Sequence, residues 1–244
     1  MNDKIIRILD VPFNNITKKE CVNEIVFKAN EEEKYFIVTA NPEILMIAYD
    51  DIKYKHTIQQ ADCILPDGIG IVMAAKLNKE PMSERVAGFD LMTDLLRVAN
   101  SNRMSCFFFG ADQAVNQSLI KNIESRYPGI IISGFQHGYL NEAEERILIN
   151  EINEKQPDFI FVALGAPKQE FWISKNLHLF KKGIFIGVGG SFDVLSGKVK
   201  RAPQLWIKYH LEWLYRIITD LKRLRRLPKI LRFVFLIIKE KSLN

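Results

Sequence analysis

Short runs of β-branched and aromatic residues alternate, before residue 205, with longer segments that carry apolar residues at helical spacing. This alternation is typical of repeated β-α units around a mostly parallel sheet, because a crossover helix must separate strands that run in the same direction. Most of the runs are continuous enough to be buried on both faces. The predicted strands are 35–39, 63–65, 105–109, 130–133, 158–164 and 183–188.

The segments between these strands have the period of amphipathic helices. Thr17, Asp112 and Asn141 stand where three of them begin, and short polar side chains at such positions cap the first backbone N–H groups. We therefore expect an α/β fold, a Rossmann-like and mostly parallel sheet flanked by helices. The predicted helices are 17–30, 43–59, 68–77, 89–101, 112–126, 141–155, 167–178 and 203–219.

The composition is that of a globular protein: 244 residues, 48% hydrophobic and 26% charged, which excludes a wholly disordered or fibrous chain. Cys21, Cys63 and Cys106 are scattered without C-x-x-C spacing. They argue against a disulfide framework or a zinc site and favour a reducing compartment. The first residues lack the apolar core of a signal peptide, so we expect a cytoplasmic protein.

The basic charge is concentrated in the tail. Residues 205–244 hold ten Lys/Arg and three Asp/Glu, a net +7 in a chain whose total is +5. The longest uncharged apolar run there, 233–238, is far shorter than the ~20 residues that span a bilayer. Pro228 is expected to kink or split the tail. An apolar stripe recurs at helical spacing: Leu214, Ile217, Ile218, Leu221, Leu224, Leu227, Leu231, Phe235 and Ile238.

Basic residues, among them Lys222, Arg223 and Arg226, flank this stripe. We predict an α/β catalytic domain over 1–200 and a basic amphipathic helical appendage over 201–244 that docks on anionic lipid. The alternative is that the stripe packs on the protein core or on a partner subunit.

Polar and glycine-rich turns follow the predicted strands. In open α/β sheets, ligands bind beyond the carboxyl ends of the strands, where helix N-termini attract anions. A phosphorylated ligand is therefore expected at this edge. The turns are 39–43 (TANPE), 66–68 (PDG), 110–112 (GAD), 165–170 (GAPKQE) and 189–193 (GGSFD).

Several nucleotide-binding motifs are absent. The runs 68–70 (GIG) and 187–190 (GVGG) do not complete G-x-G-x-x-G, because Met73 and Phe192 occupy the third glycine position. There is no Walker motif, no Asp-x-Asp pair and no metal-ligand spacing among the four histidines. We therefore expect no metal, and a diphosphate neutralised by Arg, Lys and backbone amides.

Three side chains are candidates for chemistry at this edge. Asp67 lies on a tight turn after an apolar run, where it can act as a catalytic carboxylate or as a helix cap. Arg85 can bind phosphate oxygens or form a surface ion pair. Gln169 begins a helix after a strand, and can face a ligand or water. The residues alone leave these alternatives open.

Together, seven motifs resemble the WecG/TagA/CpsF glycosyltransferases in order, and most closely the TagA branch. The resemblance covers roughly residues 5–226 and departs from the family pattern at 219–221 (TDL), where the usual tail has Glu-Pro. The motifs are the turns 39–43, 66–68, 165–170 and 189–193, together with 84–91 (ERVAGFDL), 201–203 (RAP) and 211–216 (LEWLYR).

The resemblance implies a metal-independent, inverting transferase without a cofactor or a nucleic-acid partner, peripheral on the inner face of the cell membrane. UDP-N-acetylmannosamine would be the donor. Undecaprenyl-diphosphate-linked N-acetylglucosamine would be the acceptor, in a β-1,4 transfer for the wall teichoic acid linkage unit. Two alternatives stay open: transfer of another sugar, such as N-acetylmannosaminuronic acid or glucose, and a non-catalytic nucleotide-sugar sensor. The oligomeric state, monomer or homo-oligomer, also stays open.

The same resemblance implies residue roles. Asp67 would be the general base, and Arg85 would stabilise the leaving diphosphate. Gln169 would donate or accept a hydrogen bond near the reacting centre, and Thr39 would line the sugar and diphosphate pocket. Substrate binding would involve Asn41, Gly189, Gly190, Asp193 and Arg216.

Overall fold

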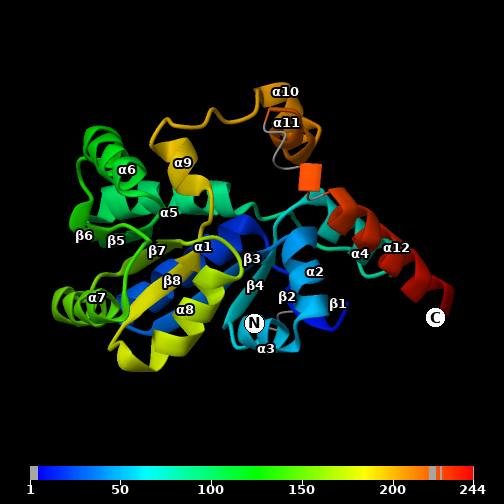
Figure 1. The fold of residues 1–244 in the computed structure, drawn as a ribbon, viewed down its shortest axis with the longest axis horizontal. Helices are drawn as coiled ribbons and strands as arrows, with labels where there is room; N and C mark the ends of the chain where they lie inside the picture. Colours follow the sequence, from blue (N-terminus) through cyan, green and yellow to red (C-terminus); the bar gives the residue numbers. More distant parts are fainter. Residues whose placement is uncertain (1–4, 220–223, 226, 244) are drawn as a thin grey trace.

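The computed structural model describes residues 5–219, 224–225 and 227–243 (Figure 1). Its centre is a six-stranded sheet with the order β4-β3-β8-β7-β5-β6, in which every pair of neighbours is parallel. The predicted α/β class and all six predicted strands are confirmed. The strands are β3 (Lys34–Ala40), β4 (Cys63–Pro66), β5 (Ser105–Gly110), β6 (Ile131–Gln136), β7 (Phe159–Ala163) and β8 (Gly183–Gly187).

The inner strands are buried on both faces, as their continuous apolar runs predict. In β5, Phe107 and Phe109 belong to the core on one side of the sheet, and Cys106 and Phe108 to the core on the other. Strand β6 differs, because it pairs only with β5 and its edge position leaves residues such as Ile131 exposed.

Helices cover both faces of the sheet. One face packs against α1 (Lys18–Asn30), α5 (Gly88–Asn102), α6 (Gln113–Arg126) and α9 (Ser191–Leu195). The other packs against α2 (Pro42–Asp50), α3 (Ile52–Gln59), α4 (Ile69–Leu77), α7 (Glu142–Lys155) and α8 (Lys168–Asn176). Thr17, Asp112 and Asn141 accept backbone hydrogen bonds at the starts of α1, α6 and α7, which confirms the three predicted caps.

Two parts of the first half differ from the prediction. The segment 43–59 is not one helix, because Asp51 adopts extended dihedral angles and its carboxylate caps α3 by accepting from Lys53 N and Tyr54 N. An unpredicted hairpin of β1 (Ile5–Ile8) and β2 (Val11–Asn14) adds Ile6 and Phe13 to the core.

The C-terminal part contains three helices in the described residues. The predicted helix 203–219 is two, α10 (Gln204–Lys208) and α11 (Glu212–Thr219), separated by His210 with a positive φ of 59°. Helix α12 (Leu227–Leu243) has Pro228 in its first turn, where the missing N–H breaks no helical hydrogen bond. Pro228 therefore lies where a new helix begins, in agreement with the expected split.

Helix α12 packs along α2 and α4 (Figure 1). Phe233 and Ile237 are only 2% exposed there, whereas Leu231, Phe235 and Ile238 of the predicted stripe remain between 58% and 69% exposed. None of the described helices is long and apolar enough to cross a membrane. The division at residue 200 stays a prediction. Leu221, Lys222, Arg223 and Arg226, and with them most of 219–221, lie outside the described residues.

Candidate active site

The turns predict a ligand crevice beyond the carboxyl ends of the strands, and the candidate residues gather around the neighbouring strands β3 and β8. After β3 the chain enters α2 on one face, and after β8 it enters α9 on the opposite face. In open parallel sheets ligands bind beyond the carboxyl ends of the strands, which is the edge where these turns lie. The turns of β4 and β7 flank them, so Asp67, Asn41, Gly189 and Gln169 follow four adjacent strands.

Asp67 lies in the turn after β4, which packs closely against the turn after β3. Its backbone N–H donates to Ala40 O at 2.9 Å, and a Cβ on Gly70 would lie 2.7 Å from Pro42 Cγ. The cap position of α4 is occupied by Gly68, with φ of 107°, one residue after Asp67. Asp67 is half-buried in this turn, and its role as general base or as helix cap stays a prediction.

Thr39 and Asn41 lie on either side of the end of β3. Gly88, at the start of α5, leaves room for Thr39, because a Cβ there would approach Thr39 Oγ1 to 2.6 Å. Asn41 Oδ1 accepts from Ile44 N at 3.1 Å and so caps α2. Asn41 thus has a structural contact at the predicted crevice, and its predicted contact with substrate stays a prediction.

Both neighbours of Arg85 in the chain are held by hydrogen bonds. The Glu84 carboxylate accepts from Lys18 N at 2.8 Å, and Val86 N donates to Pro66 O at 2.9 Å, next to Asp67. The Arg85 side chain is mostly buried. Arg85 is therefore fixed beside the turn that carries the candidate base.

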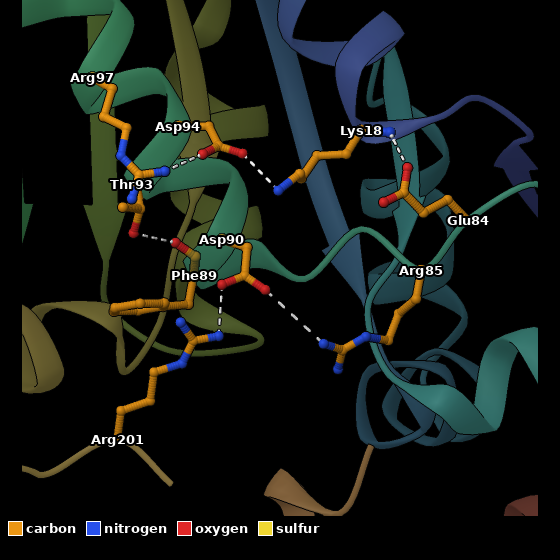
Figure 2. A network of polar contacts seen from close by, with 9 residues as sticks. All are labelled: Lys18, Glu84, Arg85, Phe89, Asp90, Thr93, Asp94, Arg97 and Arg201. Atoms are coloured by element: carbon orange, nitrogen blue, oxygen red, sulfur yellow. Dashed lines mark hydrogen bonds and ion pairs between the residues drawn. The ribbon is translucent and has the colours of Figure 1, made fainter. Parts of the chain in front are cut away.

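Asp90 lies between two guanidinium groups (Figure 2). Arg201 Nη2 is 2.6 Å from Asp90 Oδ1, and Arg85 Nη2 is 4.0 Å from Asp90 Oδ2. The Arg201 guanidinium also lies 4.4 Å from the centre of the Phe89 ring. We did not predict Asp90 or Arg201 as site residues; their only signal was membership of motifs 84–91 and 201–203.

Gln169 links two neighbouring turns of the predicted crevice. Its Oε1 accepts from Gly165 N at 3.2 Å and from Gly189 N at 3.0 Å, and its Nε2 donates to Glu170 Oε1 at 2.7 Å. Gln169 is only 5% exposed. The structure thus gives Gln169 a role in loop geometry, and its predicted hydrogen bond near the reacting centre stays a prediction.

The remaining predicted residues lie along the turn after β8 and in the tail. Gly189 has φ of 46°, and Gly190 directly precedes α9. Asp193 Oδ1 is 3.8 Å from Lys198 Nζ, and Lys198 also pairs with Asp112 at 2.7 Å. Arg216 lies in α11, and its side chain is outside the described part of the structure.

Two further observations concern metal and cysteine chemistry. Within residues 5–219, 224–225 and 227–243, no three His, Cys, Asp or Glu side chains are grouped so that they could hold a metal ion. Cys21, Cys63 and Cys106 are buried free thiols. The absence of a metal requirement stays a prediction that needs an assay.

Glu170 has a testable electrostatic consequence. Burial raises its pKa above the ordinary value of 4.5, so the folded protein binds this proton more tightly than the unfolded chain does. The stabilising contribution is present below pH 4.5 and declines as the pH rises through the folded-state pKa. Glu170→Gln removes this titration. We therefore expect the melting temperature of the variant minus that of the wild type to be larger at about pH 7 than at about pH 4. Equal temperature differences at both pH values, measured by calorimetry, would contradict this prediction.

The structure is a parallel α/β sheet with Asp67, Arg85 and glycine-containing turns at the carboxyl ends of its strands, and an anionic-ligand site at this edge stays a prediction. The chain matches the glycosyl transferase WecG/TagA/CpsF family over residues 6–244 and belongs to that family.

Two relatives are named N-acetylglucosaminyldiphosphoundecaprenol N-acetyl-beta-D-mannosaminyltransferase. The relative from Bacillus spizizenii is 42% identical over 239 residues, which cover 98% of this chain and 92% of the relative. The relative from Staphylococcus aureus strain MRSA252 is 38% identical over 242 residues, covering 98% and 94%. The chain is therefore similar to these transferases over almost the full length of both.

Proposed function

We propose that this protein transfers N-acetylmannosamine from UDP-N-acetylmannosamine to undecaprenyl-diphosphate-linked N-acetylglucosamine, with inversion, in the wall teichoic acid linkage unit. The observation that carries the proposal is the near full-length similarity to relatives with that named activity. The position of Asp67 and Arg85 at the carboxyl ends of β3 and β4 supports it, since the reaction needs a base and a cation.

Asp67 supplies the base in this scheme. The acceptor 4-hydroxyl oxygen forms a bond to the anomeric carbon of the donor, the bond from that carbon to the β-phosphate oxygen breaks, and the hydroxyl proton passes to the Asp67 carboxylate. UDP leaves with the electron pair. Attack from the face opposite the leaving group inverts the configuration and gives the β-linkage.

Arg85 stabilises the charge that develops on the departing diphosphate, with a planar fork that fits two phosphate oxygens. We expect Arg85→Lys to lower kcat by about tenfold or more, since a charge-assisted hydrogen bond contributes about 1.5–3 kcal/mol. Arg146→Lys, on the exposed surface of α7, is the matched control and should leave kcat unchanged. Steady-state assays with EDTA and with magnesium belong in the same series, because activity that requires magnesium would contradict the metal-free scheme.

The acceptor lipid stays in the bilayer, so the enzyme must reach it from the membrane surface. The exposed apolar residues of α12 and nearby basic residues such as Arg225 and Lys229 support docking on the inner face of the cell membrane. In this proposal residues 201–244 form the docking part, and Arg216 completes the site. The packing of Phe233 and Ile237 on the α/β domain fixes the orientation of α12.

A measurement of UDP release tests whether the protein is an enzyme. We expect release from UDP-N-acetylmannosamine that is strongly stimulated by the lipid-linked acceptor. Binding of the donor without release of UDP, with or without acceptor, would favour the nucleotide-sugar sensor instead.

A further inference from the structure

The side-chain amide of Gln169 is held in one orientation. Its oxygen faces two backbone donors, Gly165 N and Gly189 N, and its nitrogen faces one acceptor, Glu170 Oε1. If the amide were rotated by 180°, its NH₂ group would face two N–H donors and its oxygen would face a carboxyl oxygen. The surroundings therefore determine which end of the amide joins the two loops.

The space around the amide is also closed on the side of the sheet. A Cβ on Gly187, the last residue of β8, would lie 2.6 Å from Gln169 Nε2. The nitrogen is thus confined between the end of β8 and Glu170, which accepts from it at 2.7 Å. Glu170 is the acceptor that fixes this end of the amide.

A buried carboxyl group is costly unless its interactions offset the loss of water. Glu170 is only 1% exposed, and besides the Gln169 amide its carboxyl group has only the Tyr54 hydroxyl as a polar side-chain neighbour among the described residues. Its neighbours along α8, Phe171, Trp172 and Ile173, are hydrophobic and pack in or against the core. An apolar side chain would be cheaper to bury at position 170 if packing were the only requirement.

We propose that Glu170 is a positioning residue of the transferase site, which holds the Gln169 amide in the orientation that joins the turns after β7 and β8. The proposal rests on the proposed function, because it assigns Glu170 to the same crevice. Gly189 and Gly190 lie in one of these turns, between β8 and α9. Without the acceptor at Glu170, Gln169 Nε2 loses its partner in a closed space, and the hold of Oε1 on the two turns weakens.

Three variants separate positioning from packing. Glu170→Leu removes the acceptor. Glu170→Gln keeps an oxygen that accepts from Gln169, and its NH₂ group can donate to the Tyr54 hydroxyl. Asn176→Leu is the matched control. Asn176 is a buried polar residue at the other end of α8 that donates to Glu145 Oε1 and Trp172 O.

Two readouts are measured on the full-length protein: hydrogen exchange of the Gly165 and Gly189 amides, and kcat. We expect Glu170→Leu to speed exchange at both amides and to lower kcat by about 10-fold to 100-fold, the range that small displacements of positioning groups cause. Glu170→Gln should restore both readouts to near wild-type values. Asn176→Leu should lower the melting temperature and leave both readouts unchanged.

The outcomes distinguish this proposal from the proposed function. Unchanged exchange at Gly165 and Gly189 in Glu170→Leu, or failure of Glu170→Gln to restore kcat, would overturn the positioning role. If the wild-type protein transfers no sugar, the proposed function fails, and the exchange measurement still tests the link through Gln169.

Discussion

Replacing Asp67 by Asn is expected to lower turnover by at least ~10²-fold, the low end of the range for loss of a general base. The substitution keeps the size of the side chain and removes its basicity. Because Asn also keeps any hydrogen bond that the side-chain oxygen accepts, the free energy of unfolding should change little. The affinity for UDP should also stay close to that of the wild type, since the base acts on the acceptor.

The measurement is kcat for UDP release in the presence of acceptor, together with thermal unfolding and UDP titration. Glu154→Gln, an exposed carboxylate on α7, is the control and should have wild-type turnover. Near-normal turnover of Asp67→Asn would show that Asp67 is not the base. A fall in stability as large as the fall in activity would instead assign Asp67 a structural role.

The second large effect is expected at the outer face of α12. Combined Leu231→Glu, Phe235→Glu and Ile238→Glu should lower the affinity for anionic liposomes by at least about 100-fold, because each large apolar side chain contributes about 1.5–3 kcal/mol when fully buried. Turnover of the lipid-linked acceptor should fall with it, and turnover of a short-chain soluble acceptor should not. Liposome co-sedimentation at low and high salt measures the binding.

Deletion of the tail after about Arg201 is expected to cause the same loss of liposome binding. The three substitutions test the exposed face of α12 more specifically than this deletion does. Deletion also removes Phe233 and Ile237 and so exposes the core surface of α2 and α4. Phe27→Glu and Ile147→Glu, exposed apolar residues of α1 and α7, are the controls. Equal liposome binding by the triple variant and the wild type would reject docking through α12.

The sheet could be predicted from sequence because its strands are short apolar runs buried by the helices that follow them. The hairpin at residues 5–14 could not, since its polar positions interrupt the apolar pattern and its burial depends on packing against β4 and α4. The break at Asp51 was also missed, because hydrophobic spacing continues across it, while the Asp51 carboxylate accepts from Lys53 N and Tyr54 N and so starts a second helix.

The edge that carries the candidate site could also be predicted, since the carboxyl ends of parallel strands share one side. The contacts within it could not. Gln169 appeared as a polar residue at a helix start, and only the fold brings Gly165 and Gly189 to its oxygen. Asp90 and Arg201 are 111 positions apart in sequence, so their ion pair has no local signal.

Mass spectrometry of the lipid product from a panel of UDP-sugars tests whether the protein transfers N-acetylmannosamine to a lipid-linked aminosugar. We expect one N-acetylhexosamine to be added when UDP-N-acetylmannosamine is the donor. UDP-N-acetylmannosaminuronic acid, UDP-glucose and UDP-N-acetylglucosamine should give little or no product. A product formed preferentially from one of these other donors would contradict the assignment of the sugar, and unchanged acceptor with every donor would contradict the proposed function.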